Sequence, residues 1–255
     1  MAWRERRESR WQLMLAVALL LASAGLYLLH FLIFGDLHHI GIYLLGDLAF
    51  LPIQVLLVTL IINRLLVMRE KKTKLDKLNM VIGSFFSEVG NSLIRMVAGF
   101  DRSRGQLQEI LCVEAAWSRR DYSRARAELD AYRFEVDSRQ GDLAAVKTFL
   151  AGERNFLLGL LGNPNLLEHD TFTELLWAVF HLTEELQFRP AFDQLPAADL
   201  DHLASDMKRA YRLLLQGWLD YLQHLQGKYP YLFSLAIRIN PLNPRAAVVI
   251  GGQAS

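Results

Sequence analysis

The sequence predicts an all-α membrane protein, in which an N-terminal two-helix transmembrane hairpin is followed by a cytoplasmic helical bundle. Three observations predict this fold class. Two apolar stretches before residue 69 are each long enough to cross a bilayer. Lys and Arg gather beside the inner ends of these stretches. The rest of the sequence carries apolar residues at helical spacing and lacks the alternation that is typical of half-buried strands.

The first transmembrane helix is predicted at residues 11–34, after a basic cytoplasmic N-terminus at residues 1–10. Residues 11–34 are 24 residues without Asp, Glu, Lys or Arg. A helix of that length crosses the roughly 30 Å hydrocarbon core with some tilt. A cleavable signal peptide is the alternative, because small residues at 22–24 follow a basic start and an apolar run. Since the apolar run continues to residue 34, we favour a retained helix.

The second transmembrane helix is predicted at residues 42–63, after a short external loop at residues 35–41. Asp47 is its only formal charge. Lys and Arg are absent from the loop but cluster at residues 64–77, so the positive-inside rule places both termini in the cytoplasm. We therefore expect a multi-pass protein of the inner (plasma) membrane with its large domain on the cytoplasmic side.

The predicted cytoplasmic part begins with a basic juxtamembrane long helix at residues 64–100, loosened at Gly83 or Gly90. This stretch has no proline, and its apolar residues recur every three or four positions. A cytoplasmic helical domain is predicted at residues 101–240, and a flexible C-terminal tail at residues 241–255. Gly and Pro signals divide the domain into helices, which we expect at about residues 104–118, 121–137, 142–161, 170–188 and 199–227.

Composition and motifs exclude several classes of protein. A formal net charge of +1 gives no basic excess for nucleic acid. The single cysteine, Cys112, excludes an intramolecular disulfide framework, and we expect it to be a small buried apolar residue. Phosphate loops, dinucleotide-binding glycine patterns, nucleophile elbows and H-E-x-x-H are absent from the sequence, and no cofactor is predicted. The helical domain's tryptophans are predicted to lie in the core: Trp117, Trp177 and Trp218.

Asp47 is the candidate ion or pore site, because ionisable side chains in membrane spans are costly and often mark ion paths. Gln54 follows on nearly the same face of the helix. The remaining pore candidates fall on another face: Pro52, Thr59 and Asn63. The alternative, which we favour, places Asp47 at headgroup depth near the outer end of the helix, where water hydrates it.

Basic residues are predicted to form belts at the inner surface of the membrane, where each gains about 1 kcal/mol from anionic lipid. The lipid bilayer is therefore a predicted partner. The predicted headgroup contacts are Arg4, Arg6, Arg7, Arg10, Arg64, Arg69, Lys71, Lys72 and Lys74.

Two motifs of the soluble part pair histidine with acids at helical spacing. In FHLTEEL, His181 precedes Glu184 and Glu185, and in DLDHLASD, His202 precedes Asp206. Spacings of three and four place a histidine and an acid on one helix face, and two such helices facing each other form a candidate metal site. We favour surface hydrogen bonds and ion pairs, because the Glu-x-x-His order of di-iron bundles is absent.

These features favour a non-enzymatic, membrane-tethered helical interaction, scaffold or regulatory module that self-associates and holds a cytoplasmic protein partner. No nucleic-acid partner and no catalytic residues are predicted. The first alternative is an oligomeric ion channel, with a pore lined by the second transmembrane helix and Asp47 at its outer mouth. The second alternative is a metal-dependent enzyme of the cytoplasmic helical domain that uses the histidine and carboxylate cluster.

Overall fold

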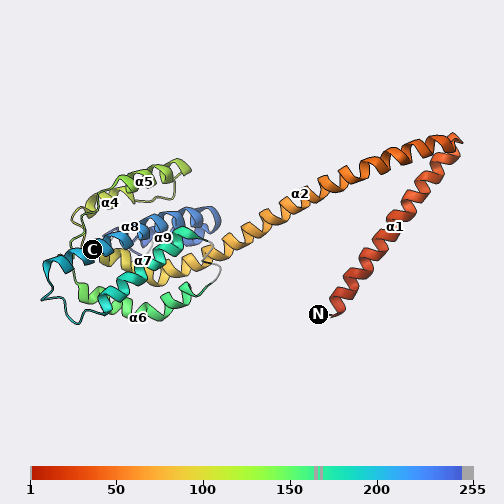
Figure 1. Ribbon diagram of the computed structural model, residues 1–255. Helices are drawn as coiled ribbons and strands as arrows, with labels where there is room; N and C mark the ends of the chain where they lie inside the picture. The colour runs from red at the N-terminus through yellow and green to blue at the C-terminus, as the bar shows by residue number, and fades with distance from the viewer. Residues whose placement is uncertain (1, 164–165, 167–168, 249–255) are drawn as a thin grey trace. The chain divides into compact units, whose positions relative to one another are not determined.

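The protein is all-helical, as the sequence predicts: the described residues contain helices and no strand (Figure 1). Contacts divide the chain into two compact units, Met1–Glu70 and Lys71–Ser255. This computed structural model describes the backbone of residues 2–163, 166 and 169–248, and the side chains of the same residues apart from 2–13, 37, 39 and 72–77.

The first unit contains two long helices, α1 (Ala2–Phe34) and the first part of α2 (Leu37–Phe85). A two-residue turn joins them. Gly35 has a φ of +64°, which glycine adopts without steric cost, and its N–H donates to the carbonyl of Phe31 at 2.8 Å. Asp36 Oδ1 accepts a hydrogen bond of 2.8 Å from the N–H of His38, which caps the start of α2. The chain thus reverses at the end of α1 (Figure 1).

Two stretches of these helices are long and apolar enough to cross a membrane, judged by length and composition: Met14–Phe34 and Ile40–Lys71. They are 21 and 32 residues long. None of their apolar side chains is buried in the described part of the chain. The two long apolar helices are therefore compatible with the predicted hairpin.

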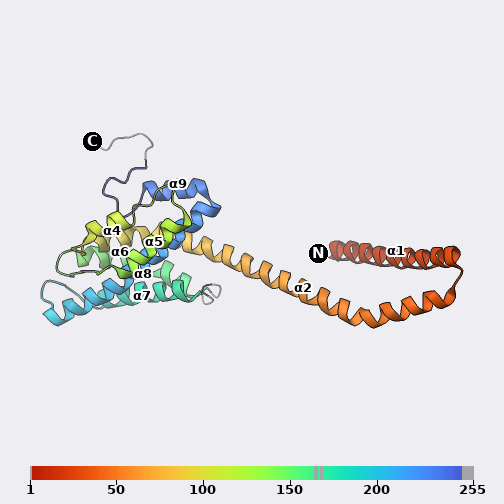
Figure 2. The ribbon, with the colours of Figure 1, turned by 90° about the horizontal axis from the view of Figure 1, so that it is seen from above.

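The second unit has one apolar core, with α8 (Ala197–Lys228) at its centre. The buried residues of α8 recur every three or four positions along its length, as at Leu203, Met207, Leu214 and Trp218. Helix α7 lies beside α8 in both views (Figures 1 and 2). The other elements of this unit are η1 (Phe86–Gly90), α3 (Asn91–Ala98), α4 (Arg104–Ile110), α5 (Arg119–Ala131), α6 (Leu143–Leu161), α7 (Asp170–Gln187) and α9 (Pro230–Arg238).

The end of α2 belongs to this core, and its helical path changes where glycine was expected to loosen it. Side chains from Leu78 onward are buried, and a π-helical turn, η1, ends at Gly90. A Cβ atom on Gly90 would lie 2.5 Å from the ring of Phe86. That ring is fully buried and stacks on Tyr221 with 5.2 Å between ring centroids. Close packing at Gly90 therefore accompanies the irregular turn.

Three predicted helices are confirmed, because α6, α7 and α8 match the expected ranges to within two residues. Two predictions overran. The helix expected to reach residue 118 ends at Ile110, because carbonyls of the following segment bind side chains from elsewhere. Gln226 Nε2 donates to the carbonyls of Ala115 and Trp117 at 3.1 and 3.0 Å. A capping box of Ser118 and Asp121 then starts α5.

The helix expected to reach residue 137 ends at Ala131. After it, the chain pairs with the segment that follows α3. Asp101 and Val136 form an isolated antiparallel bridge. The N–H of Asp137 donates to the carbonyl of Phe100 at 2.9 Å. These backbone hydrogen bonds satisfy groups that a longer helix would have paired internally.

The start of the predicted flexible tail is packed instead. Asn240, Pro241 and Leu242 are buried. Asn240 Nδ2 donates to the carbonyl of Leu111 at 2.9 Å, and its Oδ1 accepts from the N–H of Leu242 at 2.9 Å. These two bonds fix the chain across the end of α4. Residues 249–255 of the expected tail lie outside the described residues.

Two further expectations about single residues were wrong. Cys112 is exposed rather than buried, because it lies in the irregular segment after α4. Trp177 is 57% exposed, whereas Trp218 is buried in the core and Trp117 packs against it half-buried, as expected.

Candidate functional site

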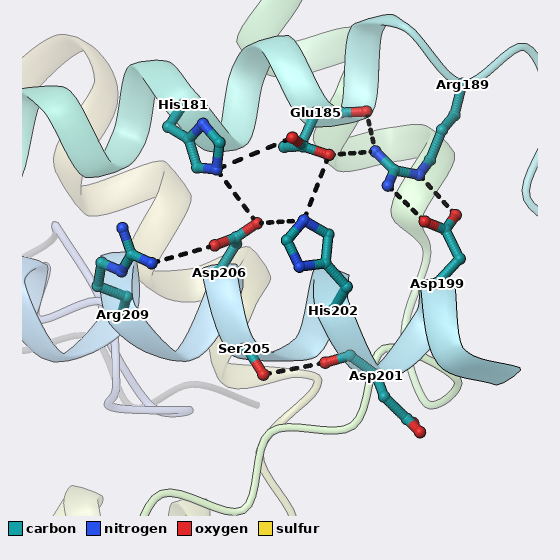
Figure 3. A network of polar contacts seen from close by, with 9 residues as sticks. All are labelled: His181, Glu185, Arg189, Asp199, Asp201, His202, Ser205, Asp206 and Arg209. Carbon is teal, nitrogen blue, oxygen red and sulfur yellow. Dashed lines mark hydrogen bonds and ion pairs between the residues drawn. The ribbon is translucent and has the colours of Figure 1, made fainter.

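A cluster of histidine and carboxylate side chains lies between α7 and α8 (Figure 3). His181 and Glu185 come from α7, and His202 and Asp206 come from α8. Each pair is spaced by four residues, so both members project from one helix face. The buried residues next to them fix these faces towards each other: Leu182, Leu186, Leu203 and Met207.

The polar atoms of the cluster converge on one another. Asp206 Oδ2 lies 3.4 Å from Nε2 of His181 and 3.3 Å from Nε2 of His202. Glu185 lies across from Asp206 and approaches the same two nitrogens, with Oε1 3.9 Å from His181 Nε2 and Oε2 3.6 Å from His202 Nε2 (Figure 3). The Nε2 atom of each imidazole therefore faces two carboxylates.

Asp206 is the buried member of the cluster. Its side chain is only 3% exposed, and its Oδ2 atom accepts no hydrogen bond. The nearest guanidinium, that of Arg209, lies 3.5 Å from the other oxygen, Oδ1. The histidine side chains remain partly exposed, at 43% for His181 and 51% for His202. A buried carboxylate oxygen without a donor is costly unless a cation compensates it.

Arg189 holds the carboxylate of Glu185 in place from the end of α7. Its Nη1 atom donates to Glu185 Oε2 at 2.7 Å. Its Nε and Nη2 atoms donate to both carboxylate oxygens of Asp199, at 2.7 and 2.6 Å. The hydrogen bond from Arg189 lowers the pKa of Glu185 despite partial burial, and it lowers the pKa of Asp199 as well. Glu185 is thus kept ionised beside the histidines.

The donor set suits a divalent transition-metal ion. Imidazole nitrogens and carboxylate oxygens are the usual ligands of zinc and related ions. His181, Glu185 and Asp206 each offer a ligand atom, and these atoms lie within 4.8 Å of one another. His202 lies beside this group of three, with its Nε2 atom 3.3 Å from Asp206 Oδ2 and 3.6 Å from Glu185 Oε2. The fifth residue of the predicted set, Glu184, is half-buried and lies outside this group.

Asp47 lies in a different place, in a pocket of about 780 Å³ within the first unit. Polar side chains from both helices line it, including Ser23 and His30 of α1 and Tyr43 of α2. The Nε2 atom of His30 is buried there without a hydrogen-bond partner. The structure thus brings Asp47 near polar groups of its own chain.

The other pore candidates do not line this pocket. Gln54 and Thr59 line a separate shallow hollow, although they were expected on different faces. Pro52 lies inside α2, and Asn63 is exposed further along that helix.

Three of the predicted headgroup contacts have described side chains, and all three are exposed: Arg64, Arg69 and Lys71. The side chains of the other six predicted contacts lie outside the described residues: Arg4, Arg6, Arg7, Arg10, Lys72 and Lys74.

Sequence reasoning missed Arg189, although a signal for it exists. Arg189 follows Glu185 by four residues, which is the spacing of a helical ion pair, and Asp199 comes ten residues later at the start of the next helix. The sequence alone does not reveal that the connection between α7 and α8 brings both acids to one guanidinium.

A helical domain preceded by two long apolar helices is the class that the fold defines. Residues 74–238 match a family model described as "Uncharacterized protein MJ1433, C-terminal helical domain", and residues 5–66 match "MJ1433, N-terminal helical domain". The chain is 44% identical over 242 residues to Uncharacterized protein MJ1433 of Methanocaldococcus jannaschii, which covers 95% of this chain and 97% of that protein. The chain therefore belongs to the MJ1433 family. No solved structure matches it.

Proposed function

We propose that the protein is a membrane-anchored helical module of the inner (plasma) membrane. In this proposal the two N-terminal helices form a transmembrane hairpin, and the second unit works at the cytoplasmic face as an interaction or regulatory module. The carrying observation is that none of the residues of the apolar stretches Met14–Phe34 and Ile40–Lys71 is buried. Soluble proteins rarely expose such large apolar surfaces, so these helices need an apolar cover.

A bilayer provides this cover over the whole length of both stretches. The shorter one has 21 residues and, at 1.5 Å per residue, spans about 32 Å, close to the hydrocarbon thickness of a membrane. The helical backbone satisfies its own hydrogen bonds inside lipid. The two-residue turn at Gly35 and Asp36 is short enough to connect two consecutive spans.

The second unit supports the role of a separate working part. Its buried apolar side chains form one cluster that begins at Leu78, and no described side chain before Leu78 belongs to that cluster. The two family models divide the chain at the same place, between residues 66 and 74. An anchor joined to an independently packed domain accounts for both observations.

The basic residues after the second apolar segment support a cytoplasmic position for the second unit. Exposed Arg64, Arg69 and Lys71 lie at that end of α2, whereas the turn between the two helices carries neither Lys nor Arg. The positive-inside rule therefore places the turn outside and both termini inside.

An interaction role is supported by aromatic side chains on the surface of the second unit. Trp177, Phe188 and Tyr231 are all exposed. Large aromatic residues are enriched at protein interfaces, where they carry much of the binding free energy. Self-association or a cytoplasmic protein partner would cover them.

The channel is the second candidate, and the observation that favours it is the polar lining around Asp47 in otherwise apolar helices. In favour of the anchor instead, the same pocket surrounds Asp47 with polar groups of its own chain, so no ring of subunits is needed to hydrate it. Native mass spectrometry in nanodiscs separates the two. A ring of three or more subunits, together with altered cation flux in Asp47→Asn, would support the channel. A monomer or dimer, together with unchanged cation flux in Asp47→Asn, supports the anchor.

Alkaline extraction of membranes tests the anchor itself. The full chain should stay in the membrane pellet at pH 11, where peripheral proteins are released. A double variant, Leu20→Arg with Leu57→Arg, places one charge within each apolar stretch at an insertion cost of about 3 kcal/mol each. This variant should be released in larger amounts. Release of the unaltered chain into the supernatant would contradict the proposal.

A further inference from the structure

We propose that His181, Glu185, His202 and Asp206 bind one divalent metal ion of the zinc class, which joins α7 to α8. The inference goes beyond membrane anchoring and does not depend on it. The ligand atoms are Nε2 of both histidines and one oxygen from each carboxylate (Figure 3).

Three of the ligand atoms are already close enough for one bound ion, because atoms of His181, Glu185 and Asp206 lie within 4.8 Å of one another. Zinc binds imidazole nitrogen and carboxylate oxygen at about 2.0–2.2 Å, so neighbouring ligand atoms of a tetrahedron lie about 3.3–3.6 Å apart. Asp206 Oδ2 lies 3.4 Å from His181 Nε2 and 3.3 Å from His202 Nε2, inside this range. Glu185 Oε1 lies 3.9 Å from His181 Nε2, slightly outside it. His202 lies outside the group of three, and a turn of its partly exposed side chain towards the ion completes the set.

The buried oxygen of Asp206 independently points to a cation at this place. Asp206 Oδ2 is shielded from solvent, accepts no hydrogen bond, and faces Nε2 of both His181 and His202. These contacts of 3.4 and 3.3 Å lack hydrogen-bond geometry, so the buried oxygen accepts no hydrogen bond. A metal ion between the three atoms would satisfy the oxygen and both nitrogens at once.

Arg189 has the role that outer residues have in metal sites. It binds Glu185 Oε2 and is itself held by Asp199 in a two-pronged contact. Oriented carboxylates of this kind increase metal affinity. Because Oε2 is occupied by Arg189, Oε1 is the Glu185 oxygen assigned to the metal.

Four protein ligands on two packed helices define a structural rather than a catalytic site. The ligands come from positions 181 and 185 on α7 and 202 and 206 on α8, so the ion would bridge the two helices across their shared face. The two histidines are partly exposed and give the ion a path from solvent. Binding of the ion is therefore expected to stabilise the second unit.

Zinc titration of the purified full chain in detergent tests the proposal. The protein for this experiment is prepared without an affinity tag, and a chelator first removes any bound metal. Calorimetry and elemental analysis after gel filtration should find one zinc per chain, and zinc should raise the melting temperature. Cobalt should bind with the intense visible absorption of a tetrahedral site.

Variants that keep the size of the side chain assign the binding to the cluster. Asp206→Asn and Glu185→Gln should each weaken zinc binding by about tenfold or more. Glu184→Gln, which alters the neighbouring acid outside the group, should bind zinc as the unaltered chain does. If Asp206→Asn fails to fold, the partly exposed His202→Gln serves in its place.

Two outcomes would overturn the proposal. One is the absence of saturable zinc binding by the unaltered chain. The other is equal zinc affinity in the unaltered chain and in a double variant, His181→Gln with His202→Gln, because binding would then occur elsewhere.

Discussion

Oδ2 of Asp206 on α8 lies 3.4 Å from Nε2 of His181 on α7, but the two atoms do not form a hydrogen bond. The two residues are 25 positions apart in the sequence. The packing of two amphipathic helices brings them together, and the loop that joins these helices adds Arg189. Substitution of these residues therefore tests how much the contact between α7 and α8 contributes to the stability of the second unit.

Arg189→Ala should destabilise the second unit by about 2 kcal/mol, because hydrogen bonds to charged groups contribute about 1.5–3 kcal/mol each and two partly buried carboxylates lose their donor. The melting temperature of the full chain in detergent should fall by about 5 °C. Arg189→Lys should keep only part of the stability that Arg189→Ala loses, since lysine cannot make the two-pronged contact to Asp199. Arg124→Ala is the control, because Arg124 forms exposed ion pairs with Asp121 and Glu128. Equal melting temperatures for the Arg189 and Arg124 variants would contradict the role of Arg189.

Acid should remove the same stabilisation. Glu185 and Asp199 have pKa values lowered below their ordinary values of 4.5 and 3.8 by Arg189. A lowered pKa in the folded state contributes stability above the unfolded pKa, and this stability is lost as the pH falls through the folded pKa. Melting temperatures measured from pH 7 to pH 3 should therefore decline below about pH 4.5, and the gap between the unaltered chain and Arg189→Ala should narrow there. A gap that stays constant would exclude this linkage.

Gly141→Ala should destabilise the protein by about 2 kcal/mol, because a Cβ atom there would lie 2.5 Å from the buried ring of Phe100. Gly152→Ala is the matched comparison. Gly152 is exposed in the middle of α6, with nothing within 4 Å of its added Cβ. Alanine at this position should stabilise the protein by about 0.5–1 kcal/mol. Thermal melting of both variants tests these two predictions. An equal loss of stability in Gly152→Ala and Gly141→Ala would refute the packing argument.

Asn240→Ala should lower the free energy of unfolding by about 2 kcal/mol, because it leaves the carbonyl of Leu111 without its hydrogen-bond donor. Asn240→Asp should also destabilise, since an ionised carboxylate cannot donate to that carbonyl. The exposed Asn243→Ala is the control and should change stability by less than about 0.5 kcal/mol. Chemical unfolding followed by tryptophan fluorescence measures all three variants. Unchanged stability in Asn240→Ala would mean that the start of the tail does not fix the core.

Local signals in the sequence predicted α6, α7 and α8, because each combines a clear apolar period with Gly or Pro beyond its ends. They failed at the end of α4. There the carbonyls are bound by Gln226 and Asn240, and these residues lie more than a hundred positions away in the sequence. Helical periodicity does not contain that information, so the predicted helix ran on to residue 118.

The candidate site was predictable only in part, for the same reason. Spacing alone put His181 on one helix face with both Glu184 and Glu185. The rotation of α7 against α8 selects Glu185, because that residue faces His202. The buried oxygen of Asp206 is a consequence of helix packing, and no local pattern of sequence reveals it.

The only cysteine of the chain, Cys112, provides the most direct test of the membrane-anchored account, because it is exposed in the second unit. A membrane-impermeant maleimide should label Cys112 in inside-out vesicles but not in intact spheroplasts. A variant that combines Cys112→Ser with His38→Cys moves the thiol to the start of α2 beside the turn and should show the opposite pattern. Labelling of Cys112 in intact spheroplasts would contradict the cytoplasmic position of the second unit and, with it, the proposed function.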